Sequence, residues 1–202
     1  MNTNWIHHLD RGTGPWTLLH LHGTGGNETQ LRGLGREIAP DATLLGVRGR
    51  SLDEGFPRFF RRFTAVRYDQ AQIREEAAAL AQFVQDAAQA YGLDPAKVLT
   101  LGYSNGANMA LAALALQPQT FQGGLFLRPV MPLDDPPGAD LSHARALILH
   151  GARDPYAAHA GAVTPYLTHS GAQVEEHTLN AGHELSQADV TLGAQWWARQ
   201  TQ

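Results

Sequence analysis

One stretch of the sequence, residues 97–116, passes from a strand pattern to a helix pattern without a loop between them. It reads KVLTLGYSNGANMALAALAL, an apolar run followed by an alanine- and leucine-rich segment. Ser104 lies at the junction, with Gly102 and Gly106 on either side. Because glycine has no side chain, it allows a strand and the following helix to approach closely. The chain is therefore restricted to folds in which strands lead directly into helices.

The rest of the sequence alternates between short apolar runs and helical patterns. We expect strands at residues 5–9, 16–22, 42–47, 97–103, 124–130, 146–150 and 173–179. We expect helices at residues 28–38, 71–91, 105–116, 157–169 and 185–199. Runs such as TLLHLHG and ALILHG are typical of central strands in a parallel sheet that helices cover on both faces. The sequence predicts an α/β fold with a doubly wound, mostly parallel sheet, in a single domain over residues 1–202.

Composition limits the classes of partner. The 202 residues carry a net charge of -4, which argues against binding to nucleic acid or to an anionic membrane. The absence of cysteine excludes disulfides, thiolate metal ligands and a cysteine nucleophile. The N-terminal residues have no signal-peptide pattern, and no stretch approaches the roughly 18 apolar residues of a membrane span. We therefore expect a cytoplasmic protein.

Residues 102–106, GYSNG, match the G-x-S-x-G nucleophile elbow, in which a tight turn presents a serine hydroxyl at the end of a strand. A serine hydroxyl is a poor nucleophile near neutral pH and needs a base within hydrogen-bond distance. That base in turn needs an acid to orient it. Ser104 is therefore a candidate nucleophile, and a glycine-rich packing turn without chemistry is the alternative.

Asp154 and His183 are the candidates for the acid and the base. In serine hydrolases built on such a sheet, the acid and then the histidine follow the nucleophile along the chain. Asp154 lies in the turn after one predicted strand, and His183 lies in a glycine-preceded loop after the last strand. Asp134 or Asp135 is the alternative acid. A purely structural role for Asp154, next to a proline in a turn, is the other alternative.

The tetrahedral intermediate of such a reaction needs an oxyanion hole. The backbone N–H of Asn105, directly after the serine, is the first candidate donor. The loop after an early strand, HGTGGNE, offers the N–H of Thr24 as the second. A simple turn into a helix capped by Asn27 is compatible with the same role.

Two other motif matches are incomplete. His20 and His22 lie at a strand end as some metal ligands do, but no acidic cluster completes a site. The glycines that follow resemble a phosphate-binding loop, yet neither the G-x-G-x-x-G spacing nor a following Lys-Ser/Thr is present. We therefore expect no metal ion and no cofactor.

An arginine-rich segment, GVRGRSLDEGFPRFFRRF, lies between a predicted strand and a long helix. Arginine binds carboxylates and phosphates through a planar fork, so Arg58 and Arg61 are candidates for substrate binding. The interpretation we favour is that the arginines of this segment pair with acids such as Asp53, Glu54 and Asp69 and hold the loop.

A tryptophan pair lies near the end of the chain. We interpret Trp196 and Trp197 as the face by which the last helix packs on the domain. A contact in a homodimer is the alternative.

Five segments together resemble one family of hydrolases. They are LHGTGGNE, RGR…FPRFFRR, LGYSNGANMA, LHGARDP and AGHEL, and the resemblance runs from about Leu18 to His183. The sequence resembles the small bacterial carboxylesterases of the phospholipase/carboxylesterase family. This branch of the α/β-hydrolase superfamily includes acyl-protein thioesterases and relatives of dienelactone hydrolase. The resemblance implies a serine esterase without a cofactor, in which Ser104, Asp154 and His183 form the triad. A loose link of some relatives to the breakdown of aromatic compounds suits a small aromatic ester.

Two departures limit what the resemblance implies. Dienelactone hydrolases use a cysteine, which this chain lacks, so their substrate is not carried over. Residues 129–145, between two predicted strands, are too few for the helical cap of many lipases. We therefore expect an open, shallow site without a cap domain and a small-molecule ester with a short acyl chain as substrate. The alternatives are a thioesterase or lysophospholipase of the same fold, or a binding protein without catalysis.

Overall fold

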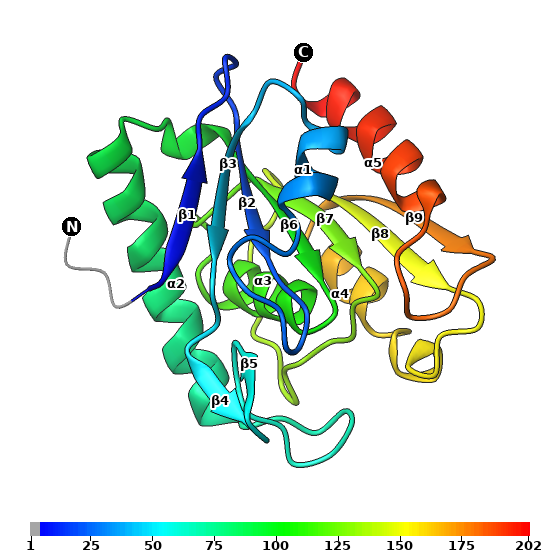
Figure 1. Cartoon of the computed structure of the whole chain (residues 1–202). Coiled ribbons are helices and arrows are strands. Elements are labelled where there is room, and N and C mark those ends of the chain that lie inside the picture. The colour runs from blue at the N-terminus through cyan, green and yellow to red at the C-terminus, as the bar shows by residue number, and fades with distance from the viewer. Residues whose placement is uncertain (1–4) are drawn as a thin grey trace.

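The computed structural model describes residues 5–202 and places a seven-stranded sheet at the centre of the molecule (Figure 1). The strands of this sheet are β1 (His7–Asp10), β2 (Thr17–Leu21), β3 (Thr43–Val47), β6 (Val98–Tyr103), β7 (Gly123–Leu127), β8 (Arg145–Gly151) and β9 (Gln173–Leu179). Their order is β1-β3-β2-β6-β7-β8-β9. β1 pairs antiparallel with β3, and the other pairs are parallel. The predicted mostly parallel sheet is confirmed.

The strand order reverses direction between β2 and β6. The chain leaves β2 toward β3 on one side and then returns to β6 on the other side of β2. In an open parallel sheet, ligands bind at such a switch point, outside the carboxyl ends of the strands. The loops after β2 and β6 therefore flank the expected site.

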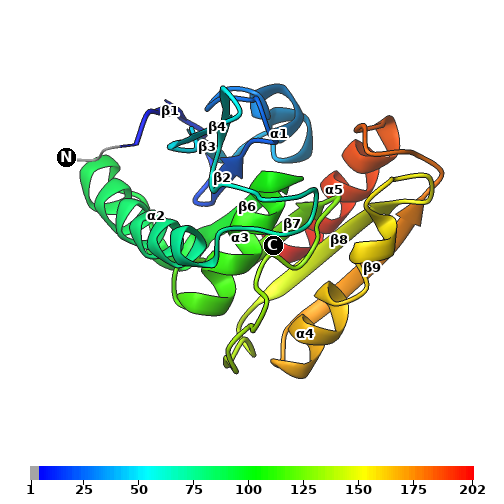
Figure 2. The ribbon, with the colours of Figure 1, turned by 90° about the horizontal axis from the view of Figure 1, so that it is seen from below.

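Helices cover both faces of the sheet (Figure 2). α1 (Arg32–Ile38) and α5 (Gln187–Gln200) pack on one face, and α2 (Gln70–Tyr91), α3 (Asn105–Leu116) and α4 (Val163–His169) pack on the other. Successive strand residues point to opposite faces, so Leu18 joins the core under α1 and α5 while Leu19 joins the core under α2 and α3. The doubly wound architecture is confirmed.

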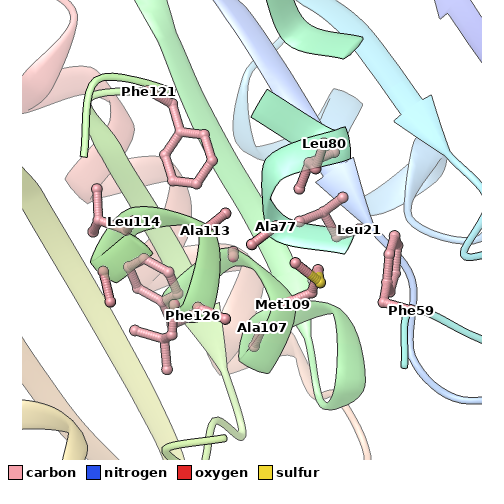
Figure 3. Close-up of a cluster of buried hydrophobic side chains, with 14 of the residues drawn as sticks. Leu21, Phe59, Ala77, Leu80, Ala107, Met109, Ala113, Leu114, Phe121 and Phe126 are labelled. Carbon is pink, nitrogen blue, oxygen red and sulfur yellow. The ribbon is translucent and has the colours of Figure 1, made fainter. Parts of the chain in front are cut away.

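α3 is the most deeply buried helix, because every residue from Asn105 to Ala115 is buried. Alanines on α2 and α3 let the two helices approach closely, and Phe126 of β7 belongs to the same buried cluster, on the side of α3 (Figure 3). Apolar burial of this kind stabilises by about 25 cal/mol per Å². The start of α3, where Ser104 lies, is therefore held by the core of the protein.

The predicted helix at residues 157–169 is wrong in its first half. The chain forms a short 3₁₀ helix, Ala157–His159, and α4 begins only at Val163. Pro165 has no backbone N–H, so a helix tolerates it in the first turn but not in the interior. A start at Val163 puts the proline in the first turn.

The predicted helix at residues 28–38 begins later than expected, at Arg32. The side chain of Asn27 accepts hydrogen bonds from the N–H and the hydroxyl of Thr29, both at 2.9 Å. Asn27 thus closes a turn of its own before the helix and does not cap α1.

A short hairpin in the arginine-rich segment was not predicted. β4 (Ser51–Asp53) and β5 (Phe56–Arg58) pair antiparallel around Glu54 and Gly55, which have φ angles of 54° and 79°. Two successive positive φ values define the type I′ turn that suits the twist of a hairpin. The hairpin lies beyond the carboxyl ends of the central strands (Figure 1).

The two tryptophans near the C-terminus are buried under the sheet. Trp196 and Trp197 belong to the core between α1, α5 and the sheet, and Trp197 packs edge-on against Trp16 with 6.3 Å between ring centroids. This is the helix-packing role that we favoured. The homodimer stays a prediction. Over residues 5–202, no helix is both long and apolar enough to span a membrane.

The buried imidazole of His20 makes the free energy of unfolding depend on pH. Its imidazole is buried in β2, its Nε2 has no hydrogen-bond partner in the described chain, and a Cβ at Gly46 would lie 2.1 Å from its Cε1. Burial lowers the pKa of His20 from 6.5 to about 4. Protonation therefore favours the unfolded chain. The contribution to stability is complete above pH 6.5, falls between pH 6.5 and 4, and levels off below pH 4.

We expect the free energy of unfolding to fall by about 3 kcal/mol more in the wild type than in His20→Leu between pH 7 and pH 4. Burial lowers the pKa of His22 and His150 in the same direction, and both remain in the variant. Urea unfolding at a series of pH values measures the difference. Parallel pH profiles for the two proteins would contradict the assignment.

Candidate active site

Ser104 lies at the junction of β6 and α3 with its backbone in the left-handed region, at φ 53°. A residue with a side chain holds this conformation only when the surrounding structure imposes it. A Cβ at Gly102 would lie 2.6 Å from the Cα of Ala107, and one at Gly106 would lie 2.0 Å from the carbonyl oxygen of Leu21. Close approach therefore requires both glycines, as predicted, and Ser104 lines a pocket beyond the strand ends.

His183 connects the serine to the predicted acid. Its Nε2 lies 2.9 Å from the Oγ of Ser104, and its Nδ1 lies 2.8 Å from Oδ2 of Asp154. Asp154 is buried, and its other carboxylate oxygen accepts the N–H of Tyr156 at 2.8 Å. Asp134 and Asp135, the alternative acids, are exposed. In this arrangement the imidazole can take the serine proton, and the carboxylate can stabilise the imidazolium.

Two tyrosines flank the imidazole of His183. The ring centroid of Tyr156 lies 5.1 Å away in an edge-on arrangement, and that of Tyr103 lies 5.5 Å away. The hydroxyl of Tyr103 donates to the backbone oxygen of His183 at 3.1 Å, and burial raises the pKa of this hydroxyl, which favours the protonated donor. The rings restrict the imidazole to an orientation that reaches both partners.

Arg128 anchors the loop that carries His183, a role that was not predicted from the sequence. Its guanidinium is buried and pairs with Asp189 through two hydrogen bonds, of 2.7 and 3.0 Å. The same group donates to the backbone oxygens of Gly182 and Glu184, on either side of His183, and to that of Leu149. Every guanidinium N–H is thus used. The available signal was an arginine directly after the apolar run of β7.

Asp189 joins this anchor to α5. Its carboxylate accepts the N–H and the hydroxyl of Ser186 at 2.7 and 2.9 Å, which completes a capping box at the start of the helix. The loop before α5 is therefore fixed at both ends, through the helix cap and through Arg128.

Thr24 and Asn105, whose N–H groups are the predicted oxyanion donors, line the same pocket as Ser104. Within residues 5–202, neither the N–H of Thr24 nor that of Asn105 has a hydrogen-bond acceptor. The β4–β5 hairpin holds the first loop through a bond from the N–H of Gly25 to the oxygen of Pro57 at 2.9 Å. The side chain of Asn105 accepts the N–H of Phe59 at 2.8 Å. Both N–H groups remain free to receive a developing negative charge.

The pocket next to Ser104 has a volume of about 210 Å³. Its wall contains residues from six separate parts of the chain, among them Thr24, Arg58, Tyr68, Asn108, Arg128, Val130, Tyr156 and His183. Of the two arginines predicted to bind substrate, Arg58 lines this pocket. Arg61 does not, because its exposed guanidinium pairs with Asp69. The pairing that we favoured for this segment describes Arg61 with Asp69 and Arg62 with Glu54, which are hydrogen-bonded ion pairs. Arg58 forms only a long ion pair, with 3.9 Å between its Nε and Oδ2 of Asp53.

Within the part of the chain that the structure describes, no three or more His, Asp or Glu side chains are grouped so that they could hold a metal ion. His22, one of the two histidines considered as ligands, donates or accepts through both ring nitrogens: Nδ1 lies 2.6 Å from the oxygen of Gly23, and Nε2 accepts the N–H of Gly49 at 2.9 Å. Its ring holds two loops together.

Comparison with known proteins shows that the chain is similar to hydrolases in sequence and in fold. The model of the phospholipase/carboxylesterase family matches residues 56–192. The putative hydrolase MhqD of Bacillus subtilis (strain 168) is 35% identical over 193 residues, which are 95% of this chain and 96% of MhqD. The chain belongs to the phospholipase/carboxylesterase family.

Solved structures agree with this assignment. The Bacillus cereus carboxylesterase has a TM-score of 0.94 at 32% identity, covering 98% of this chain and 95% of that protein. A carboxylesterase from Mesorhizobium loti has a TM-score of 0.94 at 36% identity, covering 98% and 96%. The predicted family, the α/β-hydrolase fold and the class of reaction, hydrolysis of carboxylic esters, are confirmed.

Proposed function

We propose that this protein is a serine carboxylesterase that hydrolyses small or short-acyl esters through a covalent acyl-enzyme. The observation that carries the proposal is the chain of two hydrogen bonds from Ser104 through His183 to the buried Asp154. A strained serine at a strand-to-helix junction, with two free backbone N–H groups beside it, supports the same chemistry.

In the first half of the reaction, Ser104 attacks the ester carbonyl while His183 takes the hydroxyl proton. Asp154 holds the imidazole in the tautomer that presents Nε2 to the serine. The N–H groups of Thr24 and Asn105 receive the oxyanion of the tetrahedral intermediate. His183 then protonates the leaving alcohol, and the acyl group remains on the serine.

In the second half, water replaces the alcohol. His183 removes a proton from the water, which attacks the acyl carbonyl, and the second tetrahedral intermediate uses the same two N–H groups. Collapse of this intermediate returns the proton to Ser104 and releases the carboxylic acid.

The dimensions of the site support a small substrate. The pocket of about 210 Å³ is smaller than the roughly 300–1,000 Å³ of sites for drug-sized ligands. Residues 128–144, between β7 and β8, contain no helix in the described structure, so no cap forms there to enclose a long acyl chain.

Initial rates on p-nitrophenyl acetate, butyrate, octanoate and palmitate test the proposal. We expect the highest kcat/KM at acetate or butyrate, because the pocket accepts a short acyl group. A fluorophosphonate probe followed by peptide mass spectrometry should label Ser104 and no other serine. A matched thioester and oxyester of the same acyl group complete the comparison.

Each of the other outcomes would favour a different function. A maximum at octanoate or longer favours a lysophospholipase, for which the exposed Leu52, Phe56 and Phe63 offer apolar surface. A preference for the thioester favours a thioesterase. If Ser104 is not labelled and no ester is hydrolysed, the proposal that this protein is a catalyst is contradicted.

A further inference from the structure

The arginine-rich segment contains one guanidinium that differs from the others. Its other arginines each bind a carboxylate closely: Arg48 with Glu28, Arg50 with Glu76, Arg61 with Asp69 and Arg62 with Glu54. Arg58 has no such bond. Its nearest carboxylate oxygen, on Asp53, lies 3.9 Å from Nε and accepts the backbone N–H of Arg62 instead.

The guanidinium of Arg58 is nevertheless buried, with a side-chain exposure of 4%. Its Nε donates to the backbone oxygen of Phe60 at 3.1 Å, and its Nη1 donates to the hydroxyl of Thr24 at 2.7 Å. Nη2 has no acceptor among residues 5–202. Nη2 is not one of the fully buried side-chain atoms without a partner, so it keeps contact with solvent and is accessible to a ligand. Because burial of the rest of the guanidinium costs free energy, an anion that binds Nη2 would offset part of that cost.

Arg58 and Ser104 line the same pocket. This wall includes three arginines, and none of the described residues that line it is an aspartate or a glutamate. Arg128 is neutralised by Asp189, and Arg62 is bonded to Glu54. Arg58 is thus the cation in this wall that lacks a hydrogen-bonded carboxylate.

We infer that Arg58 binds a carboxylate on the substrate, so that the preferred esters carry an anionic group close to the scissile carbonyl. The inference rests on the proposed function and names its substrate class. A carboxylate matches the planar fork of a guanidinium and its charge, whereas a neutral carbonyl group offers one acceptor oxygen and no negative charge. Because Arg58 also donates a hydrogen bond to the hydroxyl of Thr24, a carboxylate bound to Arg58 would lie near the residue whose N–H is a predicted oxyanion donor.

Two pairs of esters of matched shape test the inference on the wild-type enzyme, with a pH-stat to follow acid release. Monomethyl succinate and methyl levulinate differ by a carboxylate against an acetyl group on the acyl side. Acetoxyacetate and acetoxyacetone differ in the same way on the alcohol side. We expect kcat/KM to favour the anionic ester by about tenfold or more in one pair, which identifies the side that Arg58 binds.

In Arg58→Met, the ratio of kcat/KM for the anionic ester to that for its neutral partner should fall by about 10–100-fold. The ratio is the readout because loss of the bond to Thr24 changes both rates by a common factor. Arg58→Lys should give an intermediate ratio, since it keeps the charge and loses the fork. Arg61→Gln, whose side chain lies outside the pocket, should leave the ratio as in the wild type.

A wild-type ratio of one or less in both pairs would overturn the inference, even if no variant folds. An unchanged ratio in Arg58→Met would do the same and would assign Arg58 a positioning role toward Thr24. In both cases hydrolysis of the neutral esters and labelling of Ser104 would leave the proposed function standing. Loss of those two activities from the wild type would instead contradict the proposed function.

Discussion

Replacement of Ser104 by alanine should lower kcat/KM for p-nitrophenyl acetate by about 10⁴-fold or more, with the fold retained. The hydroxyl is the atom that attacks in the proposed mechanism, and its 2.9 Å contact with His183 activates it. Removing one oxygen atom at the pocket wall leaves the packing of β6 and α3 in place. Initial rates and circular dichroism on the same preparation measure the two effects.

Ser142→Ala is the matched control, because Ser142 is exposed and lies outside the pocket. It should retain wild-type rates. Equal activity in purified Ser104→Ala and wild type would refute the assignment of the nucleophile. If circular dichroism shows that Ser104→Ala has lost the fold, the loss of activity would instead come from disruption of the junction between β6 and α3.

Replacement of Arg128 by methionine should lower the free energy of unfolding by about 3–5 kcal/mol. The substitution leaves the fully buried carboxylate of Asp189 without its cation and frees the backbone oxygens of Gly182 and Glu184. For a chain of this size the loss corresponds to roughly 6–20 °C in Tm. Urea unfolding and thermal melts measure it, and kcat in the folded protein should fall because the His183 loop loses its anchor.

Two further variants distinguish the effect of breaking the buried Arg128–Asp189 pair from the effect of removing any one charge. Arg199→Met breaks a half-exposed pair with Glu175 and should change stability by no more than about 1 kcal/mol. The double variant Arg128→Met/Asp189→Leu should be more stable than Arg128→Met alone, because it removes the unpaired carboxylate. A Tm for Arg128→Met within a degree of the wild type would show that the anchor contributes little.

Much of the fold follows from local pattern. Apolar runs at the strands, helical periodicity after them and glycine at close approaches are properties of short stretches, so they are readable without the partner segments. The wrong predictions of secondary structure occur where a proline or a turn sequence conflicts with the pattern of apolar residues. Pro165 moved the start of α4, and the Glu54-Gly55 turn formed a hairpin despite Pro57 in its second strand, which weakens a strand prediction.

The candidate site divides in the same way. Ser104, Asp154 and His183 were chosen as candidates because each lies in the turn or loop after a predicted strand, and the carboxyl ends of parallel strands meet at one edge of the sheet. That reasoning gives proximity and chain order. The distances of 2.9 and 2.8 Å that join the three side chains come from packing of the loops.

The roles of the arginines were decided by the tertiary structure alone. Arg58 and Arg61 are three residues apart in one basic segment, yet the hairpin turns the first into the pocket while the second pairs with Asp69 in solvent. Arg128 and its partner Asp189 are 61 residues apart. Local sequence determined the sheet, the elbow and the triad candidates, because those depend on neighbours along the chain. Which charges are buried, paired or free depends on contacts between distant segments, and only the folded chain defines those contacts.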